Sequence, residues 1–141
     1  MFNLQIIVGR LVEDPELHGE VSREDYEFED EYEADKGSEY ASFRVATWHF
    51  KTDATGADKK YTSHHHVDVY DAELAKTCVE KLKKGSSVLV AGRNWTNNWL
   101  EKGVRRSRSF IRAEVVRFLN PAEINDPDII KVYLREFIER I

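Results

Sequence analysis

The sequence predicts a mainly β protein: a five-stranded antiparallel barrel with one helix between its third and fourth strands and an added helix at the C-terminal end. The chain of 141 residues is long enough for one domain that buries roughly two-thirds of its unfolded surface. Apolar and polar residues alternate in five short stretches, which is the period of strands with one buried face. Apolar residues at helical spacing occur in two further stretches, 71–84 and 128–141.

The first predicted strand covers residues 3–12, where Ile6 and Val8 fall on one face and Ile7 and Leu11 on the other. This segment has no basic start and no small-residue cleavage site, so we expect a strand and not a signal peptide. No apolar run approaches the roughly 20 residues that a membrane span needs. We therefore expect no membrane contact.

Residues 13–39 are expected to form a long loop insertion, and they hold most of the negative charge. Thirteen acidic residues stand against Arg23 and Lys36, so the stretch has a net charge of −11. The other residues hold 19 basic and 13 acidic side chains, a net of +6. The overall charge of −5 therefore does not exclude nucleic acid as a ligand, because a phosphate backbone meets the local field.

Two interpretations of this insertion stay open. It is a solvated loop, or it imitates phosphate and competes for a binding face or meets a basic partner. Tyr26, Phe28 and Tyr32 alternate and permit a short hairpin within it.

The second and third strands are predicted at 40–51 and 61–70, with a loop at 52–60 between them. Their core face carries apolar residues: Ala41, Phe43, Val45, Val67 and Val69. Their opposite face carries aromatic, basic and polar residues: Arg44, Ala46, Trp48, Phe50, His64, His66, Asp68 and Tyr70.

Residues 71–84 predict a helix, because Leu74 and Cys78 recur at helical spacing, lysines crowd the last turn and Gly85 follows. The fourth and fifth strands are predicted at 87–98 and 104–119. Five short alternating strands indicate an antiparallel barrel. A helix between the third and fourth strands is typical of the oligonucleotide-binding (OB) fold, so we predict an OB-fold barrel for residues 1–120.

Pro121 ends the last strand and begins a C-terminal helical extension, residues 121–141. Asn125 or Asp126 can cap a helix that has Pro127 in its first turn. The apolar stripe of this helix consists of Ile130, Tyr133, Leu134, Phe137, Ile138 and Ile141. The helix either docks on its own barrel or makes an oligomer contact.

Three predicted strands carry rings and arginines on the face opposite their apolar face. Single-stranded nucleic acid needs this combination, because bases stack on aromatic rings at about 1–3 kcal/mol per base while cations follow the phosphates. In the last strand this face lies opposite the series Ile111, Ala113 and Val115, which is expected to join the core. The residues predicted in this way to bind single-stranded DNA (ssDNA) are Arg44, Trp48, Phe50, Trp95, Trp99, Arg106, Arg108, Phe110 and Arg112.

The alternative is that these rings belong to the core, as most single tryptophans of small β proteins do. Trp48 and Phe50 weaken it, because they alternate with the apolar series of their strand and do not join it.

A series of short segments carries a family resemblance. In chain order they are Ile7–Leu11, Asp14–Leu17, Phe43–Thr47, His65–Tyr70, Leu74–Ala75, Leu82–Ser86, Val88–Arg93 and Ala113–Leu119. Together they resemble bacterial single-stranded-DNA-binding proteins (SSB) over residues 2–17 and 40–119. The resemblance implies an OB-fold, a homo-oligomer (tetramer or dimer) and binding of ssDNA with little sequence preference.

By position, the family's stacking rings fall near Phe50 (or Trp48), His64, Tyr70 and Trp99, and Arg93 completes the expected ssDNA-binding set. The chain departs from the family in its acidic insertion and in its ending. It stops in a helix, without the flexible acidic tail through which the family recruits replication and repair proteins. We expect such partners to use another surface, or to be absent.

Little in the sequence indicates catalysis. His64, His65 and His66 invite a metal, but on a strand only two of the three imidazoles share a face. Cys78 is the only cysteine, which excludes an intramolecular disulfide and a cysteine zinc cluster and favours a reducing compartment. Glycine-rich phosphate loops and nucleophile motifs are missing from the sequence. We expect no enzyme activity, no metal and no cofactor.

The sequence thus favours a cytoplasmic, nucleoid-associated protein that binds ssDNA by base stacking and phosphate contacts and protects it in replication, recombination or repair. The second interpretation is an OB-fold accessory protein of the primosome kind, which acts mainly through protein–protein contacts and binds nucleic acid weakly. A metal-dependent nuclease is a distant third.

Overall fold

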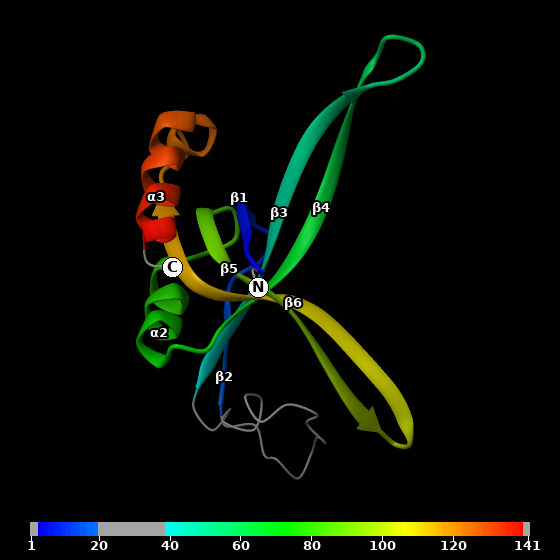
Figure 1. Ribbon diagram of the computed structural model, residues 1–141, viewed down its shortest axis with the longest axis vertical. Coiled ribbons are helices and arrows are strands. Elements are labelled where there is room, and N and C mark those ends of the chain that lie inside the picture. Colours follow the sequence, from blue (N-terminus) through cyan, green and yellow to red (C-terminus); the bar gives the residue numbers. More distant parts are fainter. Residues whose placement is uncertain (1–2, 20–38, 140–141) are drawn as a thin grey trace.

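The computed structural model describes residues 3–19 and 39–139, and it confirms the predicted fold class. Five strands close a barrel, one helix lies between the third and fourth of them, and a further helix follows the last strand (Figure 1). The elements are β1 (Gln5–Leu11), β2 (Glu16–His18), β3 (Tyr40–Thr52), β4 (Asp58–Val69), α2 (Ala72–Lys81), β5 (Ser87–Glu101), β6 (Val104–Leu119), the short 3-10 helix η2 (Glu123–Asn125) and α3 (Pro127–Glu139).

The short strand β2 corrects the expectation that all of 13–39 is loop. Its three residues pair with the start of β3, with Leu17 opposite Ala41. A three-residue strand is too short to show an alternation, so its sequence carries no strand signal. The hairpin considered at Tyr26, Phe28 and Tyr32 lies outside the described residues.

The barrel closes along two short seams. The strand order is β1-β5-β6-β4-β3-β2, and β1 pairs in addition with β3 through Arg10 and Leu11. The other seam is a parallel pairing of β4 with β6, in which Val67 lies opposite Ile111 and Asp68 opposite Arg112. At the first seam the strands cross so closely that a Cβ on Gly9 would collide with the carbonyl of Ala46, so only glycine fits there.

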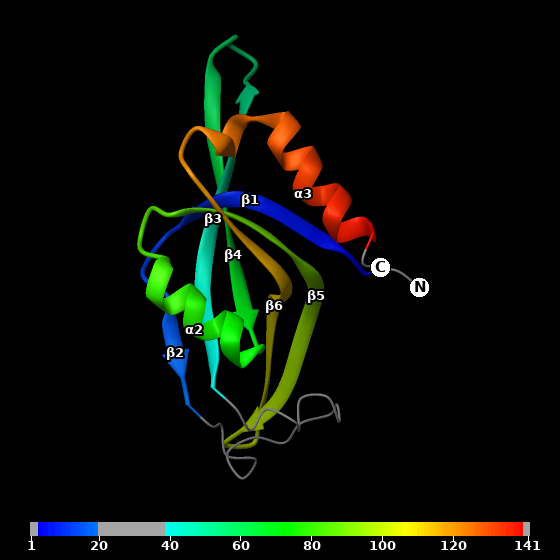
Figure 2. The same ribbon diagram turned by 90° about the vertical axis from the view of Figure 1, so that its left-hand side faces the viewer.

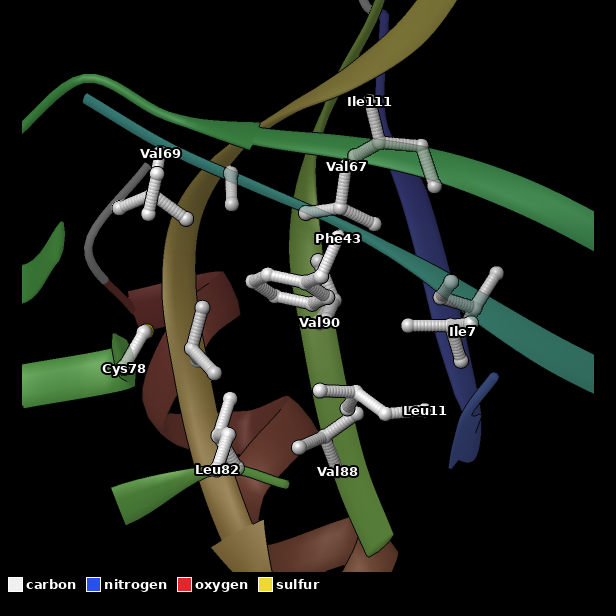
Figure 3. Close-up of a cluster of buried hydrophobic side chains, with 14 of the residues drawn as sticks. Ile7, Leu11, Phe43, Val67, Val69, Cys78, Leu82, Val88, Val90 and Ile111 are labelled. Atoms are coloured by element: carbon white, nitrogen blue, oxygen red, sulfur yellow. The ribbon is translucent and has the colours of Figure 1, made fainter. Parts of the chain in front are cut away.

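The barrel interior is a closely packed apolar cluster (Figure 3). Side chains from all five barrel strands meet in it, including Ile7, Leu11, Phe43, Val45, Val67, Val69, Val88, Val90, Ile111 and Val116. Helix α2 adds Ala75 and Cys78 to the same cluster. Asp71 caps this helix, since its carboxylate accepts a hydrogen bond from the backbone N–H of Leu74 at 3.0 Å.

Helix α3 lies on the outside of the barrel (Figure 2). A second apolar cluster lies under it. Phe137 of α3 packs there with Leu89, Ala91, Val115 and Leu119. The C-terminal helix therefore docks on its own barrel, which was one of the two possibilities that its apolar stripe left open.

The expectation that Val115 joins Ile111 and Ala113 in the barrel interior is wrong. The pairing of β5 with β6 slips by one residue between Ala91 and Gly92, which leaves Glu114 as the extra residue of a β-bulge. A slip of one residue moves the next side chains to the opposite face, so Val115 turns outward to α3 and Val116 turns inward.

Two hairpins extend beyond the barrel as long arms (Figures 1 and 2). The β3–β4 arm is paired from Ala41 opposite Val69 out to Thr52 opposite Asp58, and the β5–β6 arm ends in a turn at Lys102 and Gly103. The arms leave toward opposite ends of the molecule's long axis. Most of the stretch 52–60, expected as a loop, is therefore the tip of a hairpin.

Of the helices in the described part of the chain, none is long and apolar enough to cross a membrane.

Candidate nucleic-acid interface

Strand register places eleven of the twelve predicted residues on one surface of the barrel and its arms, and ring contacts with Tyr40 and Phe110 place Tyr70 on it as well. In the β3–β4 hairpin Arg44 lies opposite His66, and Trp48 lies opposite Thr62. Residues directly opposite each other in a sheet point to the same side. Because Phe43 and Val45 point into the barrel, this series points out, and we call its continuation over four strands the outer face.

The β5–β6 hairpin continues the outer face. Its cross-strand pairs are Arg93 with Arg112, Trp95 with Phe110, Asn97 with Arg108, and Trp99 with Arg106. The parallel pair Asp68–Arg112 joins this hairpin to β4, so the outer face runs over β3, β4, β6 and β5 without a break.

Aromatic rings form a connected row at the centre of the outer face. The ring centroids of Tyr40 and Tyr70 lie 5.2 Å apart, and those of Tyr70 and Phe110 lie 6.2 Å apart, both edge to face. The guanidinium of Arg112 stands 4.3 Å from the centroid of Tyr70 and 5.7 Å from that of Trp95. Rings and cations are thus interleaved, as base stacking and phosphate contact require.

Sequence reasoning missed two members of this row, Tyr40 and His18, whose rings stack at 4.7 Å. Tyr40 has the same parity as Arg44 in its strand, so the alternation itself could have identified it. His18 belongs to β2, and its position depends on the pairing of β2 with β3, which no local sequence pattern predicts.

Phe110 does not offer the exposed ring that was expected. It lies on the outer face but is only 2% exposed. Tyr70 packs against its edge, and the guanidinium of Arg108 stands 5.1 Å from its centroid. Its position beside the β4–β6 seam, where neighbours crowd from both sides, explains this burial.

Phe50 is the most exposed phenylalanine, tyrosine or tryptophan ring of the set, at 66%, and lies far out on the β3–β4 arm. Trp48, one step nearer the barrel on the same face, is half-buried. The guanidinium of Arg10 and the ammonium of Lys60 lie 5.5 and 5.1 Å from its ring. The arm therefore presents aromatic surface with cations at its edge.

Carboxylates of the chain itself pair with Arg44, Arg93, Arg106 and Arg108 of the predicted set. Three of these pairs are exposed: Arg44 with Glu13 at 2.9 Å, Arg93 with Glu114 at 3.1 Å, and Arg106 with Glu101 at 3.8 Å. Exposed ion pairs contribute little stability, so an incoming phosphate can replace these carboxylates at small cost.

The fourth pair is buried. Asp68 is fully buried and accepts hydrogen bonds from both terminal nitrogens of Arg108, at 2.9 and 3.2 Å, and from the hydroxyl of Tyr70 at 2.9 Å. Burial works against the charge of Arg108, but its bonds to Asp68 raise the pKa of the guanidinium above the ordinary value. This cluster fixes Arg108 and Tyr70 at the point where the two arms diverge.

The three consecutive histidines are divided between two faces, as alternation requires. His64 and His66 lie on the outer face, while His65 shares a 2.9 Å hydrogen bond with Thr47 on the other side of the arm. Burial lowers the pKa of His66, and the nearby Arg108 and Arg44 lower it further. Within residues 3–19 and 39–139, no group of three or more His, Cys, Asp or Glu side chains is placed to hold a metal ion.

Comparison with known proteins adds an independent line of evidence. The family model described as "Single-strand binding protein family" matches residues 2–119. A structure of the Plasmodium falciparum SSB in complex with ssDNA is similar at 23% identity with a TM-score of 0.66, over 85% of this chain and 96% of that one. A deletion mutant of the single-stranded DNA binding protein from Thermus aquaticus is similar at 20% identity with a TM-score of 0.65, over 86% of this chain and 52% of that one. At these identities the two structures support the fold.

Proposed function

The chain belongs to the single-strand binding protein family, and from this premise we propose that it binds single-stranded DNA along the outer face, with little sequence preference. The observation that carries the proposal is the interleaving of rings and guanidinium groups over four adjoining strands, from Phe50 on one arm to Trp99 on the other. The resemblance to a structure solved with ssDNA supports it.

In this binding mode, aromatic side chains contact the bases and arginines contact the phosphates. Bases stack on the accessible rings of the arms, namely Trp48, Phe50, Trp95 and Trp99, because every base offers an aromatic face whatever its sequence. The arginines beside these rings hold the phosphates. Each exposed arginine–carboxylate pair exchanges its carboxylate for a phosphate oxygen of similar geometry.

The centre of the outer face serves as a rigid platform in this proposal. The hydroxyl of Tyr70 is held by Asp68, and Arg112 lies over the same ring. A ring that is already fixed loses little side-chain entropy when a base stacks on it. Tyr40 is therefore added to the proposed binding set, which already contains Tyr70, and the ring of Phe110 supports Tyr70 edge to face.

The proposal extends to assembly. Among the described residues, the stretch Gln5–Gly9 of β1 pairs with β5 on one side only, which leaves an open strand edge. A second copy of the chain can pair there without displacing α3, which covers the adjoining sheet face. A homo-oligomer that protects ssDNA in replication, recombination or repair, and that meets other proteins of those processes, is the role we propose.

Tryptophan fluorescence during titration with oligo-dT tests the proposal. Wild-type protein should show deep quenching at submicromolar concentration, and the Trp48→Ala, Trp99→Ala double variant should bind about tenfold more weakly or worse, because it loses stacking at two positions. Ala54, at the arm tip, provides a control as Ala54→Ser, which should bind like wild type. Equal affinity of the double variant and wild type contradicts the proposal.

A further inference from the structure

An open hollow of about 200 Å³ lies on the outer face. Three basic side chains from three different strands line it, Arg44 of β3, His66 of β4 and Arg108 of β6, together with two carboxylates, Glu13 and Glu16. A water molecule takes up about 30 Å³ in the liquid, so the hollow has room for the oxygens of a phosphate group and some of its water.

The basic groups of the hollow still have donors to offer. A guanidinium carries five N–H donors, and Asp68 accepts from two nitrogens of Arg108, which is 36% exposed. His66 lies directly opposite Arg44 across the two strands, so the side chains share one side of the sheet. Two guanidinium groups and an imidazole together can hold an anion, and the carboxylates that oppose one in this hollow are Glu13 and the largely exposed Glu16.

A carboxylate of the chain already holds one of these groups. Glu13 Oε1 accepts a hydrogen bond from Arg44 Nε at 2.9 Å, and Glu13 lines the same hollow. This bond with Arg44 holds the pKa of Glu13 below its usual value, so the side chain is ionised at neutral pH.

The backbone on both sides of Glu13 is fixed, so the contact is built into the fold. The N–H of Val12 donates to the carbonyl of Arg44 at 3.0 Å. The carboxylate of Asp14 accepts from the backbone N–H of Lys84 at 2.7 Å. With its neighbours tied to β3 and to the turn after α2, Glu13 is held over Arg44.

We propose that the hollow formed by Arg44, His66 and Arg108 is a site for one backbone phosphate of ssDNA, and that Glu13 is an internal competitor whose carboxylate the phosphate must displace. A carboxylate and a phosphodiester present similar oxygens and the same single negative charge to a guanidinium, so each can take the place of the other. This inference rests on the proposed function and adds a device that weakens DNA binding at one defined position.

Removing the competitor tests the inference. Glu13→Gln keeps the size of the side chain and removes its charge, and Glu80→Gln on the exposed side of α2 is the matched control for net charge. We expect Glu13→Gln to bind oligo-dT about twofold to fivefold more tightly than wild type at low salt, because the cost of breaking an exposed ion pair disappears. Glu80→Gln should bind like wild type.

The same variants should differ in their salt dependence if Arg44 gains a phosphate contact. The slope of log K against log salt should become steeper by about 0.7 in Glu13→Gln. In an Arg44→Met background, Glu13→Gln should give no gain. A gain of equal size in Glu13→Gln and Glu80→Gln, or a gain that persists with Arg44→Met, overturns the inference.

Titration with inorganic phosphate separates this inference from the proposed function. The NMR signals of the His66 ring should shift at lower phosphate concentration in Glu13→Gln than in wild type. If phosphate shifts His66 while oligo-dT does not bind, the anion site stands and the proposed function fails. If oligo-dT binds wild type while Glu13→Gln gains nothing and phosphate leaves His66 unmoved, the site fails and the proposed function stands.

Discussion

Replacement of Asp68 should destabilise the fold more than replacement of any exposed carboxylate on the outer face. Asp68 is fully buried, and Asp68→Ala leaves the Arg108 guanidinium and the Tyr70 hydroxyl without the acceptor they share. Loss of one partner of a buried ion pair costs about 3–5 kcal/mol. Because Arg108 is 36% exposed and can turn toward water, we expect about 2–3 kcal/mol, or a fall in Tm of roughly 5–10 °C.

Urea unfolding at pH 7 measures this loss, and the Arg108→Met background supplies the decisive comparison. In that background Asp68 is a buried carboxylate without its cation, so Asp68→Asn should stabilise the protein there although it destabilises the wild type. The reasoning is refuted if Asp68→Ala costs less than about 0.5 kcal/mol, or if Asp68→Asn destabilises both backgrounds equally.

Two further predictions concern the barrel. Gly9→Ala should disturb the crossing of β1 and β3, because its Cβ would meet the carbonyl of Ala46. We expect it to lower the free energy of unfolding, measured in urea, by about 2 kcal/mol or more. Gly19→Ala has open space around it and should lower the free energy of unfolding by at most a few tenths of a kcal/mol. Burial raises the pKa of the Cys78 thiol to about 11, so Ellman's reagent at pH 8 should leave it unmodified until the protein unfolds. Because the folded protein favours the neutral thiol, the contribution of that burial to the free energy of unfolding is fully present below the ordinary thiol pKa of 9.0 and is lost as the pH rises toward 11. Rapid labelling of the folded protein, or a free energy of unfolding that does not change from pH 8 to 11, contradicts this prediction.

The sequence predicted which side chains share a face much better than it predicted what they contact. Alternation has a period of two, so parity places Arg44 and Trp99 each on the face of its own strand opposite the core series, and the pairing of β4 with β6 joins these faces into one surface. Parity fails where a strand contains an extra residue, as at Glu114, and the only local sign of that bulge is Gly92, whose Cβ would collide with the backbone of Arg112. The role of these residues in DNA binding stays a prediction.

Contacts between distant segments could not be predicted from local patterns. Asp68 and Arg108 are 40 residues apart, and they meet because β4 and β6 close the barrel in parallel over two residue pairs. The same closure covers Phe110, which its strand pattern places on the outer face. A pattern read along one strand gives the direction of a side chain, whereas its exposure depends on the strands beside it.

The ion pairs of the outer face determine how much each phosphate contact gains in the DNA binding that we propose. The buried carboxylate of Asp68 stays bonded to Arg108, because breaking a buried ion pair is costly. This pair therefore fixes the position of Arg108 and adds little free positive charge to the outer face. In the proposed binding mode, the exposed acids Glu13, Glu101 and Glu114 give up their arginines to phosphate groups. Each exchange gives up one favourable contact to form another, which lowers the net gain per phosphate. DNA affinity on such a face should therefore depend on stacking more than on charge, and the loss on replacing Trp48 and Trp99 should persist at salt concentrations that abolish the gain in Glu13→Gln.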